Sequence, residues 1–488
     1  MSAIAEPSTS SRTPSRAPAG ARAWAGVPGW WALVVVLTSA AFATAFVTNG
    51  LSRWENYQTN AFDLAFFDQI IWNTSRGDWF QTTFVGYNFA GQHLEPILLL
   101  FVPAYWLGAG PPLLLATQAV VAGLAAIPLY AAARRFGLPI ALSAGVAISY
   151  LLNPYLHRAL DFDFHPEAMV ALPVFAAAWA VAAQRYRLAA ALALSTMLFK
   201  EDAAFVALAL AALLWFEGAR REAIVTGAIA VSYALIAVLI VMPLVRDGAA
   251  SDLVGRYGYL VDAGRQSQFL PRLLARPWTI PQQLFAPAQL WTMALFSGAS
   301  GPLAVLRPRL LVFLLPGLAI ALLASHPPQR SLEFHYSAEL VPLVIVFGLL
   351  GARKAVNRVP PPAVLGAILL PVAVGFLALS PFSPTGARSQ NPSPAHLAAL
   401  NEGLALVPND PAEEVSAQSS LLPRLSQRPN AWEFPQAASR ADWVVVDRYT
   451  HRSGQSVAAG YDAALATVRA TLERVYDRDG VEVFRRMR

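Results

Sequence analysis

Residues 137–183 read GLPIALSAGVAISYLLNPYLHRALDFDFHPEAMVALPVFAAAWAVAA. A polar segment, DFDFHPEA at 161–168, stands between two apolar runs. Apolar runs of this kind recur from Trp30 to Ser380, and few charges interrupt them. A membrane-spanning helix needs about 20 predominantly apolar residues. The sequence therefore predicts a polytopic α-helical membrane protein whose helices are punctuated by polar groups.

The composition favours the same class. Of the 488 residues, 56% are hydrophobic and 14% are charged, whereas a soluble domain usually has about 25% charged residues. The net charge of +6 does not indicate a nucleic-acid partner, because the arginines stand at the ends of apolar runs and form no single basic patch. The absence of cysteine excludes disulfides, thiolate nucleophiles and cysteine-bound metals.

The apolar runs predict about eleven transmembrane helices in a helical domain at residues 29–380. The expected spans are 29–48, 112–133, 138–157, 167–184, 188–217 (two short helices broken by KED), 223–243, 286–306, 310–324, 336–352 and 362–380. Basic residues follow alternate spans, at 134–135, 185–187, 220–221, 307–309 and 353–358. Since Lys and Arg concentrate on the cytoplasmic side, the N-terminus is expected inside a plasma (inner) membrane. Residues 49–111 and 244–284 are then outer loops.

The two ends of the chain differ from the apolar middle. Residues 1–28 are rich in Ser, Pro, Ala and Arg and are expected to form a disordered cytoplasmic tail. Residues 381–488 are expected to form a small α/β domain, because ADWVVVDRY at 441–449 is typical of a buried strand. Residues 461–486 predict an amphipathic helix, a DRDG turn and a short strand. The odd number of spans makes this domain extracytoplasmic.

Residues suited to chemistry gather at the predicted outer ends of helices. FDLAFFDQ at 62–69 carries Asp63 and Asp68 in a segment expected to lie as a helix in the membrane interface. Helix capping is an equally good account of these two acids. In GQHLEP, capping before a proline at the first helical turn explains Glu95 but not His93.

The polar residues of DFDFHPEA alternate with apolar ones. In an extended segment this alternation puts the polar groups on one side, and Pro166 favours an extended backbone at His165. Such a set suits a general base, the binding of an acceptor, or a divalent cation such as Mg²⁺ or Mn²⁺. A hydrated helix cap is the alternative, although it needs fewer ionisable groups. The residues concerned are Asp161, Asp163, His165 and Glu167.

Two further polar groups interrupt apolar runs. Charges at membrane depth are costly and usually face a cavity or pair with one another. This applies to Lys200, Glu201 and Asp202, for which a simple ion pair in a tight turn is the alternative. His335 and Tyr336 begin the predicted span at 336–352, and helix stabilisation by a His–Glu pair would explain them singly.

The order of these features resembles the GT-C class of polytopic glycosyltransferases, which includes protein mannosyltransferases and the lipid A aminoarabinose transferase. More closely, it resembles an uncharacterised bacterial family of membrane proteins in which FDLAFFDQ, DFHPE and KED recur in this order. The resemblance covers about residues 30–340. It departs from the class at His93, which is followed by one proline and not two, and in the dense DFDFHPE cluster, which relatives lack.

The resemblance implies inverting transfer of a sugar from a polyprenyl-phosphate donor to an acceptor at the extracytoplasmic face of the lipid bilayer. By position, Asp63 matches the acidic residue that the class carries in its first outer loop and would be the general base. Lys200 and His93 would bind the donor phosphate. The remaining substrate-binding candidates are Glu95, Glu201, Asp202, His335 and Tyr336, with Asp68 as a secondary one. A transporter or lipid flippase, and a non-catalytic scaffold for the C-terminal domain, are the alternative functions.

Overall fold

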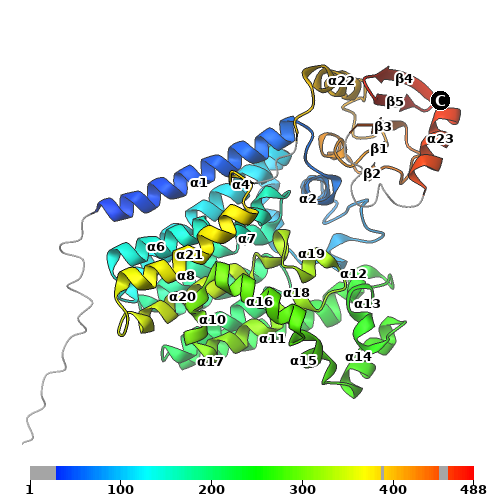
Figure 1. The fold of residues 1–488 in the computed structure, drawn as a ribbon. Coiled ribbons are helices and arrows are strands. Elements are labelled where there is room, and N and C mark those ends of the chain that lie inside the picture. Colours follow the sequence, from blue (N-terminus) through cyan, green and yellow to red (C-terminus); the bar gives the residue numbers. More distant parts are fainter. Residues whose placement is uncertain (1–28, 386–389, 450–459, 488) are drawn as a thin grey trace, which may run out of the picture.

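The computed structural model describes residues 29–385, 390–449 and 460–487. A bundle of helices runs from the start of α1 (Trp30–Glu55) to the opposite end of the molecule, where a small sheet domain and α12 to α15 lie (Figure 1). The expected tail at residues 1–28 lies outside the described residues. The functional groups described below lie at the end of the bundle that carries the sheet domain.

Most predicted apolar runs are helices. Four described helical segments are long and apolar enough to cross a membrane, or five if a bent pair counts as one span. They are Trp30–Glu55, Pro111–Arg135, Arg220–Arg246 and Pro361–Leu379, with Pro327–Ser337 and Leu340–Ala355 as the pair bent by 70°. Shorter apolar helices are Pro96–Trp106, Pro166–Ala182, Tyr186–Leu198, Ala204–Phe216 and Pro308–Leu322. The expected total of about eleven spans stays a prediction.

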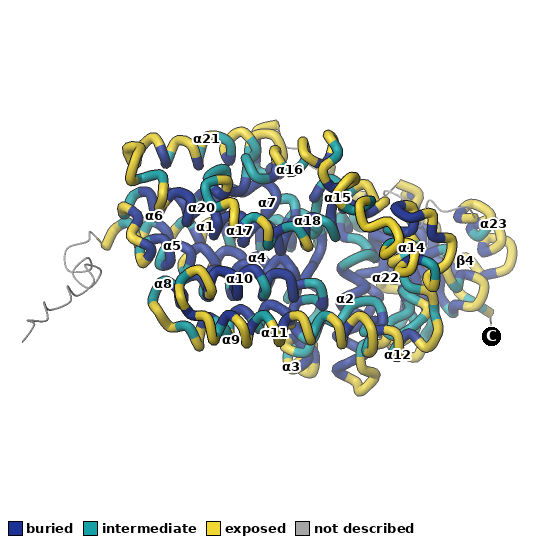
Figure 2. The backbone as a smooth tube through the Cα atoms, turned by 90° about the horizontal axis from the view of Figure 1, so that it is seen from below, coloured by how far each residue is buried: buried dark blue, intermediate teal, exposed yellow. Residues whose placement is uncertain are grey.

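The bundle has a buried centre and an exposed exterior (Figure 2). In α20 (Leu340–Ala355), every residue from Leu340 to Ala352 is buried, as expected for a helix that is apolar on all sides. α1 instead leaves large apolar side chains exposed, among them Leu33 and Leu37. A helix whose outward face is apolar suits contact with lipid, since lipid chains replace water as the surrounding medium.

Small residues let α1 pack closely against α4 (Pro111–Leu124). A Cβ atom on Gly123 would lie 3.0 Å from the backbone oxygen of Ser39 and 3.1 Å from Cβ of Ala43. Close approach of backbones at small residues is the usual basis of helix association in membranes.

The polar segments lie where helices of the bundle are interrupted. α7 (Pro154–Asp161) ends before a short extended stretch, and α8 (Ala171–Ala182) resumes after the 3₁₀ turn Pro166–Met169. The residues between α9 (Tyr186–Ser195) and α10 (Ala204–Phe216) contain KED, as predicted from the interrupted run. Since backbone groups outside helices need other partners, these breaks gather polar side chains at one level of the bundle.

The predicted outer loops contain helices of their own. The first carries the π-helical turn Ala61–Ala65 and α2 (Phe66–Ser75). Every residue of α2 is buried within the protein, so its apolar side chains pack against other parts of the chain. Its expected position in the membrane interface stays a prediction. The second loop carries α13 (Asp252–Tyr257), α14 (Gln266–Ala275) and α15 (Thr279–Leu284).

The C-terminal part of the chain forms a five-stranded sheet of order β2-β1-β3-β5-β4. β1 (Val415–Ala417) pairs in parallel with β2 (Ala431–Glu433) and with β3 (Trp443–Asp447), whereas β5 (Val481–Arg485) is antiparallel to β3 and β4 (Glu473–Arg478). The helices α22 (Pro394–Ala405) and α23 (Tyr461–Thr471) belong to the same domain (Figure 1).

The predicted strand at 441–449 is confirmed by β3, but the helix predicted from residue 461 ends earlier than expected, at Thr471. The following residues form β4, which turns back into β5 at Asp479 and Gly480, both with positive φ. An Asp-Gly pair with two left-handed residues is typical of a tight hairpin, and the hairpin therefore overrides the helical pattern.

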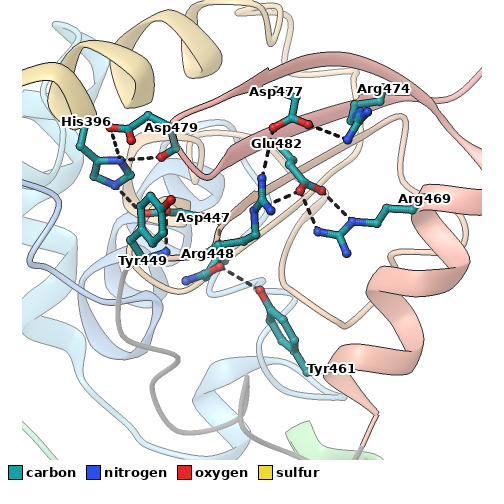
Figure 3. Close-up of polar contacts among 11 residues, drawn as sticks. His396, Asp447, Arg448, Tyr449, Tyr461, Arg469, Arg474, Asp477, Asp479 and Glu482 are labelled. Carbon is teal, nitrogen blue, oxygen red and sulfur yellow. Dashed lines mark hydrogen bonds and ion pairs between the residues drawn. The ribbon is translucent and has the colours of Figure 1, made fainter.

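Polar contacts fasten the sheet domain internally (Figure 3). His396 contacts carboxylates on both flanks, with Nε2 3.0 Å from Oδ2 of Asp447 and Nδ1 3.3 Å from Oδ2 of Asp479. The buried carboxylate of Glu482 accepts hydrogen bonds from Nε and Nη2 of Arg469 at 2.9 and 2.7 Å, and Nε of Arg448 lies 3.2 Å away. These contacts join α22 and α23 to the sheet, and this structural role explains them.

Candidate active site

A cavity of about 710 Å³ lies where α10, the π-helical turn Ala237–Val241, α18 (Leu315–Leu322) and the helices α12 (Met242–Arg246) to α15 meet. Apolar residues such as Leu239, Leu270 and Ile320 form much of its wall. Val238 and Leu239 line the cavity and belong to Arg220–Arg246, a segment long and apolar enough to cross a membrane. The apolar wall is therefore formed in part by a candidate membrane span.

One end of the cavity is strongly polar. Residues from four separate segments line it, and most of them are groups that the sequence singles out. They are Gln92, His93, Glu167, Lys200, Glu201, Asp202, His335, Tyr336 and Glu339. The prediction that distant stretches bring their ionisable side chains together at one end of the bundle is confirmed for these residues.

Buried ion pairs organise this polar end. Nζ of Lys200 donates a hydrogen bond to Oε1 of Glu167 at 3.0 Å. Nδ1 of His93 lies 2.9 Å from Oε1 of Glu201, whose other oxygen accepts a bond from the backbone N–H of Leu94 at 2.9 Å. Lys200 and His93 are thus each committed to a carboxylate, which makes them weaker phosphate-binding candidates than the sequence indicates.

Glu95 lies just behind this end of the cavity and is 1% exposed. Its burial, and next the neighbouring Glu167 carboxylate, raise the pKa of Glu95 well above the ordinary value. Oε2 of Glu95 has no hydrogen-bond partner among the described residues. A helix cap would leave the carboxylate bonded to backbone N–H groups, and no such side-chain bond is found for Glu95.

Asp63, His165 and His335 form a second group next to the cavity. Nε2 of His165 lies 2.8 Å from Oδ2 of Asp63. Burial alone lowers the pKa of His165, but the Asp63 carboxylate outweighs this effect and the net pKa is raised. The ring of His335, which lines the cavity, stacks on the ring of His165 with centroids 3.7 Å apart. His165 therefore connects Asp63 to the cavity wall.

One ligand atom from each of these three residues lies within 4.8 Å of the other two. That spacing suits a divalent cation. The two imidazole rings, however, are inclined by only 18°. Because the lone pair of an imidazole nitrogen lies in the plane of its ring, two stacked rings cannot both direct a lone pair to one ion unless a ring rotates. The geometry supports a hydrogen-bonded acid–base group better than a preformed metal site.

The expectation that Asp161 and Asp163 share one face with His165 is wrong. Asp161 ends α7 and accepts a hydrogen bond from Asn49 at 2.9 Å. The buried carboxylate of Asp163 pairs with Nη2 of Arg53 at 2.9 Å and accepts the backbone N–H of Asn60 at 2.6 Å. Because α1 extends to Glu55, beyond the predicted end at residue 48, it supplies Asn49 and Arg53. The two aspartates therefore attach α1 to the segment that carries His165 and do not join its group.

Asp68 also lies away from the cavity. It is buried in α2 and accepts hydrogen bonds from the hydroxyls of Tyr105 at 2.7 Å and Ser426 at 2.6 Å, and from Nε2 of Gln427 at 3.3 Å. Burial raises its pKa from 3.8 to about 6, although these hydrogen bonds lower it in part. We therefore interpret Asp68 as a residue that contacts the sheet domain and not as a substrate-binding residue.

The sheet domain contacts the segment before Asp63 at two more places. Oγ of Ser419 accepts the backbone N–H of Ala61 at 3.1 Å. The guanidinium of Arg424 lies 4.1 Å from the ring centroid of Trp54 and donates to the backbone oxygen of the same residue at 2.8 Å. These contacts hold residues that precede Asp63, in α1 and in the π-helical turn.

Arg246 and Arg256 also line the cavity, and neither is among the site residues that the sequence predicts. Arg246 is 8% exposed and has no ion pair or side-chain hydrogen bond within the described part of the chain. Arg256 donates to Oε1 of Gln329 at 2.7 Å. A signal was present in the sequence, because the predicted outer loop at 244–284 carries five arginines. The bias of basic residues toward the cytoplasm does not explain arginines on the outer side.

Solved structures with a similar fold exist. The crystal structure of ArnT from Cupriavidus metallidurans bound to undecaprenyl phosphate matches with a TM-score of 0.50 and 14% identity, over 94% of this chain and 98% of that chain. The apo structure of the same enzyme gives 0.47 and 16% identity over 91% and 98%. The expected GT-C-like fold is confirmed, and at such identities the likeness extends to the fold alone.

No protein among curated ones is detectably similar to the chain. Residues 53–483 match the family described as "Predicted membrane protein (DUF2079)". This match covers the helical bundle after α1 and nearly all of the sheet domain, and it confirms the expected membership of an uncharacterised membrane-protein family. The chain belongs to the DUF2079 family of membrane proteins.

Proposed function

We propose that the protein is an integral membrane glycosyltransferase that takes a sugar from a polyprenyl-phosphate donor and transfers it to an acceptor. The observation that carries the proposal is the position of the Asp63–His165 pair beside a cavity with one polar end and an apolar wall formed in part by a candidate membrane span. Such a cavity fits a ligand that is polar at one end and a long hydrocarbon at the other. ArnT, which shares the fold, binds undecaprenyl phosphate, a ligand of this kind.

In the proposed reaction, Asp63 removes the proton from an acceptor hydroxyl. The acceptor oxygen then attacks the anomeric carbon of the sugar, and the bond from that carbon to the phosphate oxygen breaks with inversion. Polyprenyl phosphate leaves with the bonding electron pair. A positioned general base contributes about 10²–10⁴-fold to such a step. His165 orients the carboxylate of Asp63 by their contact at 2.8 Å.

The leaving phosphate is assigned to Arg246 and Arg256. Both line the cavity, and Arg246 is buried without another partner among the described residues. Arginine suits this role because its planar donors match phosphate oxygens and its charge persists at all relevant pH values. This replaces the expected role of Lys200, which is paired with Glu167.

The distribution of basic residues supports an extracytoplasmic site. The helix ends rich in arginine, such as Arg134 and Arg135 in α5 (Ala126–Arg135), are assigned to the cytoplasm. The sheet domain and the loop helices lie at the end of the bundle away from the start of α1 (Figure 1). We place this end outside the plasma membrane, with the N-terminus inside.

The test is donor consumption by the purified full-length protein in lipid nanodiscs. Undecaprenyl phosphate bearing a hexose is supplied with total membrane lipid as acceptor, and release of undecaprenyl phosphate is followed by mass spectrometry. Asp63→Asn is expected to abolish the release while the protein stays folded. The exposed Asp410→Asn is the control. Full activity of Asp63→Asn would contradict the proposed base, and no release of undecaprenyl phosphate by the wild-type protein would contradict glycosyl transfer.

A further inference from the structure

Arg246 and Arg256 line the cavity from the loop helices and supply positive charge. They border the polar end of the cavity, because Arg256 hydrogen-bonds to Tyr336 and Arg246 packs against Gly91. The polar end itself is acidic, with Glu167, Glu201, Asp202 and Glu339 lining it. Its two cationic groups, Lys200 and His93, are already bonded to carboxylates. The acidic end therefore has an excess of negative charge.

Several hydrogen-bond acceptors at the acidic end have no donor. Each belongs to a residue that lines the cavity, and each is buried without a hydrogen-bond partner in the described part of the chain. They are Oε1 of Gln92, Oε2 of Glu167, Oδ1 of Asp202 and Oε1 of Glu339. Buried polar atoms are nearly always hydrogen-bonded in folded proteins, and an unpartnered one costs about 1–3 kcal/mol. A bound group rich in donors would supply what these atoms lack.

We infer that the acidic end binds the sugar of the donor through its hydrogen-bond donors and selects against sugars that carry a carboxylate. The inference rests on the proposed function, which places the phosphate at Arg246 and Arg256. With the phosphate at the arginines and the hydrocarbon along Val238, Leu239 and Leu270, the sugar lies toward the carboxylates. Hydroxyl groups can donate to the unpartnered oxygens, whereas a sugar carboxylate would bring like charge into a poorly hydrated space.

The experiment compares three ligands on the wild-type protein in nanodiscs by native mass spectrometry. They are undecaprenyl phosphate alone, undecaprenyl phosphate bearing a neutral hexose, and undecaprenyl phosphate bearing the matching hexuronic acid. The neutral hexose lipid is expected to bind about tenfold or more tightly than the hexuronate lipid, since 1.4 kcal/mol of repulsion already gives a factor of ten.

Variants locate the source of the selection. The double variant Asp202→Asn/Glu339→Gln is expected to bring the affinities for the two sugar lipids within about threefold of each other, because it removes two of the four carboxyl groups at this end. Arg246→Gln is expected to lower the affinity for all three ligands by a similar factor. Glu473→Gln, which alters an exposed pair with Arg485, is the matched carboxylate control.

The outcomes separate the two proposals. If undecaprenyl phosphate alone does not bind, the proposed function fails and the inference fails with it. If the bare lipid phosphate binds but the hexuronate lipid binds as well as the hexose lipid, only the inference is overturned. The wild-type comparison decides this point without any variant, so a variant that fails to fold does not affect the test.

Discussion

The imidazole rings of His165 and His335 stack with centroids 3.7 Å apart and planes inclined by 18°. His165 comes from the extended stretch before α8, and His335 from the 3₁₀ turn Phe334–Ser337 before α20. The stack therefore joins two breaks in the bundle, and it fixes the ring that contacts Asp63 at 2.8 Å. This arrangement gives the two histidines different roles, one in hydrogen bonding and one in packing.

His165→Gln and His335→Phe are expected to separate these roles. Loss of the imidazole that orients the base lowers transfer by about 100-fold, within the range for positioned acid–base groups. Phe at 335 keeps the stacked ring, so transfer stays within about fivefold of the wild-type rate, since aromatic stacking persists without the nitrogen atoms. Initial rates of undecaprenyl phosphate release measure both effects. Equal losses in the two variants would contradict the division of roles.

The organisation of the bundle is accessible from sequence because the membrane imposes it. Long apolar runs predict helices, and a charged triplet such as KED within a run predicts a break, since charged groups must find partners at that depth. The same reasoning predicts that Asp63, His165 and Lys200 lie at one end of the molecule. Their gathering is thus a consequence of burying ionisable groups in a chain that is otherwise apolar.

The partners of individual acids are not accessible in the same way. Asp163 pairs with Arg53 in α1, and Asp68 contacts Ser426 in the sheet domain. These contacts span 110 and 358 residues of sequence. Periodicity identifies the face of an element on which a residue lies, but it does not identify the element that packs on that face. For this reason the DFDFHPE cluster is divided: Asp161 and Asp163 contact α1, whereas His165 contacts Asp63 and Glu167 contacts Lys200.

A buried pair supports the polar end of the cavity, and a double-mutant cycle measures it. Lys200→Met leaves Glu167, which has a side chain only 4% exposed, without its cation. Removal of one member of a buried ion pair typically costs about 3–5 kcal/mol. Lys200→Met/Glu167→Gln leaves neither member of the pair charged and is expected to recover part of that loss. Unfolding of the protein in detergent micelles, followed by intrinsic tryptophan fluorescence, gives the coupling energy.

The cycle has a clear contrary result. If the double variant loses as much stability as the sum of the two single variants, the contact at 3.0 Å contributes no coupling. Arg474 and Asp477 form an exposed pair at 2.6 Å and provide the comparison. Their coupling is expected to be about 0.2–1 kcal/mol, as for other surface pairs.

Gly91 makes room for Arg246. A Cβ atom at position 91 would lie 2.7 Å from Cγ of Arg246 and 3.1 Å from its backbone nitrogen. Gly91→Ala is therefore expected to displace the arginine and to destabilise the protein by about 1–3 kcal/mol, as overpacking usually does. The affinity for undecaprenyl phosphate should fall together with the melting temperature. Native mass spectrometry and thermal unfolding measure the two quantities.

Gly86→Ala is the matched control, because no atom lies within 4 Å of the added Cβ position. It lies in the same loop and leaves Arg246 in place. An unchanged affinity in Gly91→Ala, together with a lowered melting temperature, would show that Arg246 is not needed for phosphate binding.

The contact between Asp68 and the sheet domain predicts a pH-dependent stability. Burial raises the pKa of Asp68 from 3.8 to about 6, so the folded protein binds this proton more tightly than the unfolded chain. The stabilisation is fully present below about pH 4 and is lost as the pH rises through about 6. At one pKa unit per 1.36 kcal/mol, the loss is about 3 kcal/mol.

Asp68→Asn removes this titration, since the amide oxygen still accepts a hydrogen bond from Ser426 or Tyr105 but carries no charge. The melting temperature of Asp68→Asn relative to wild type is therefore expected to rise between pH 4 and pH 7. Thermal unfolding at half-unit steps of pH, with Asp410→Asn as the control, measures the difference. A difference that stays constant over this range would mean that the carboxylate of Asp68 titrates alike in the folded and unfolded states. The hydroxyls of Tyr105 and Ser426 would then fully offset its burial.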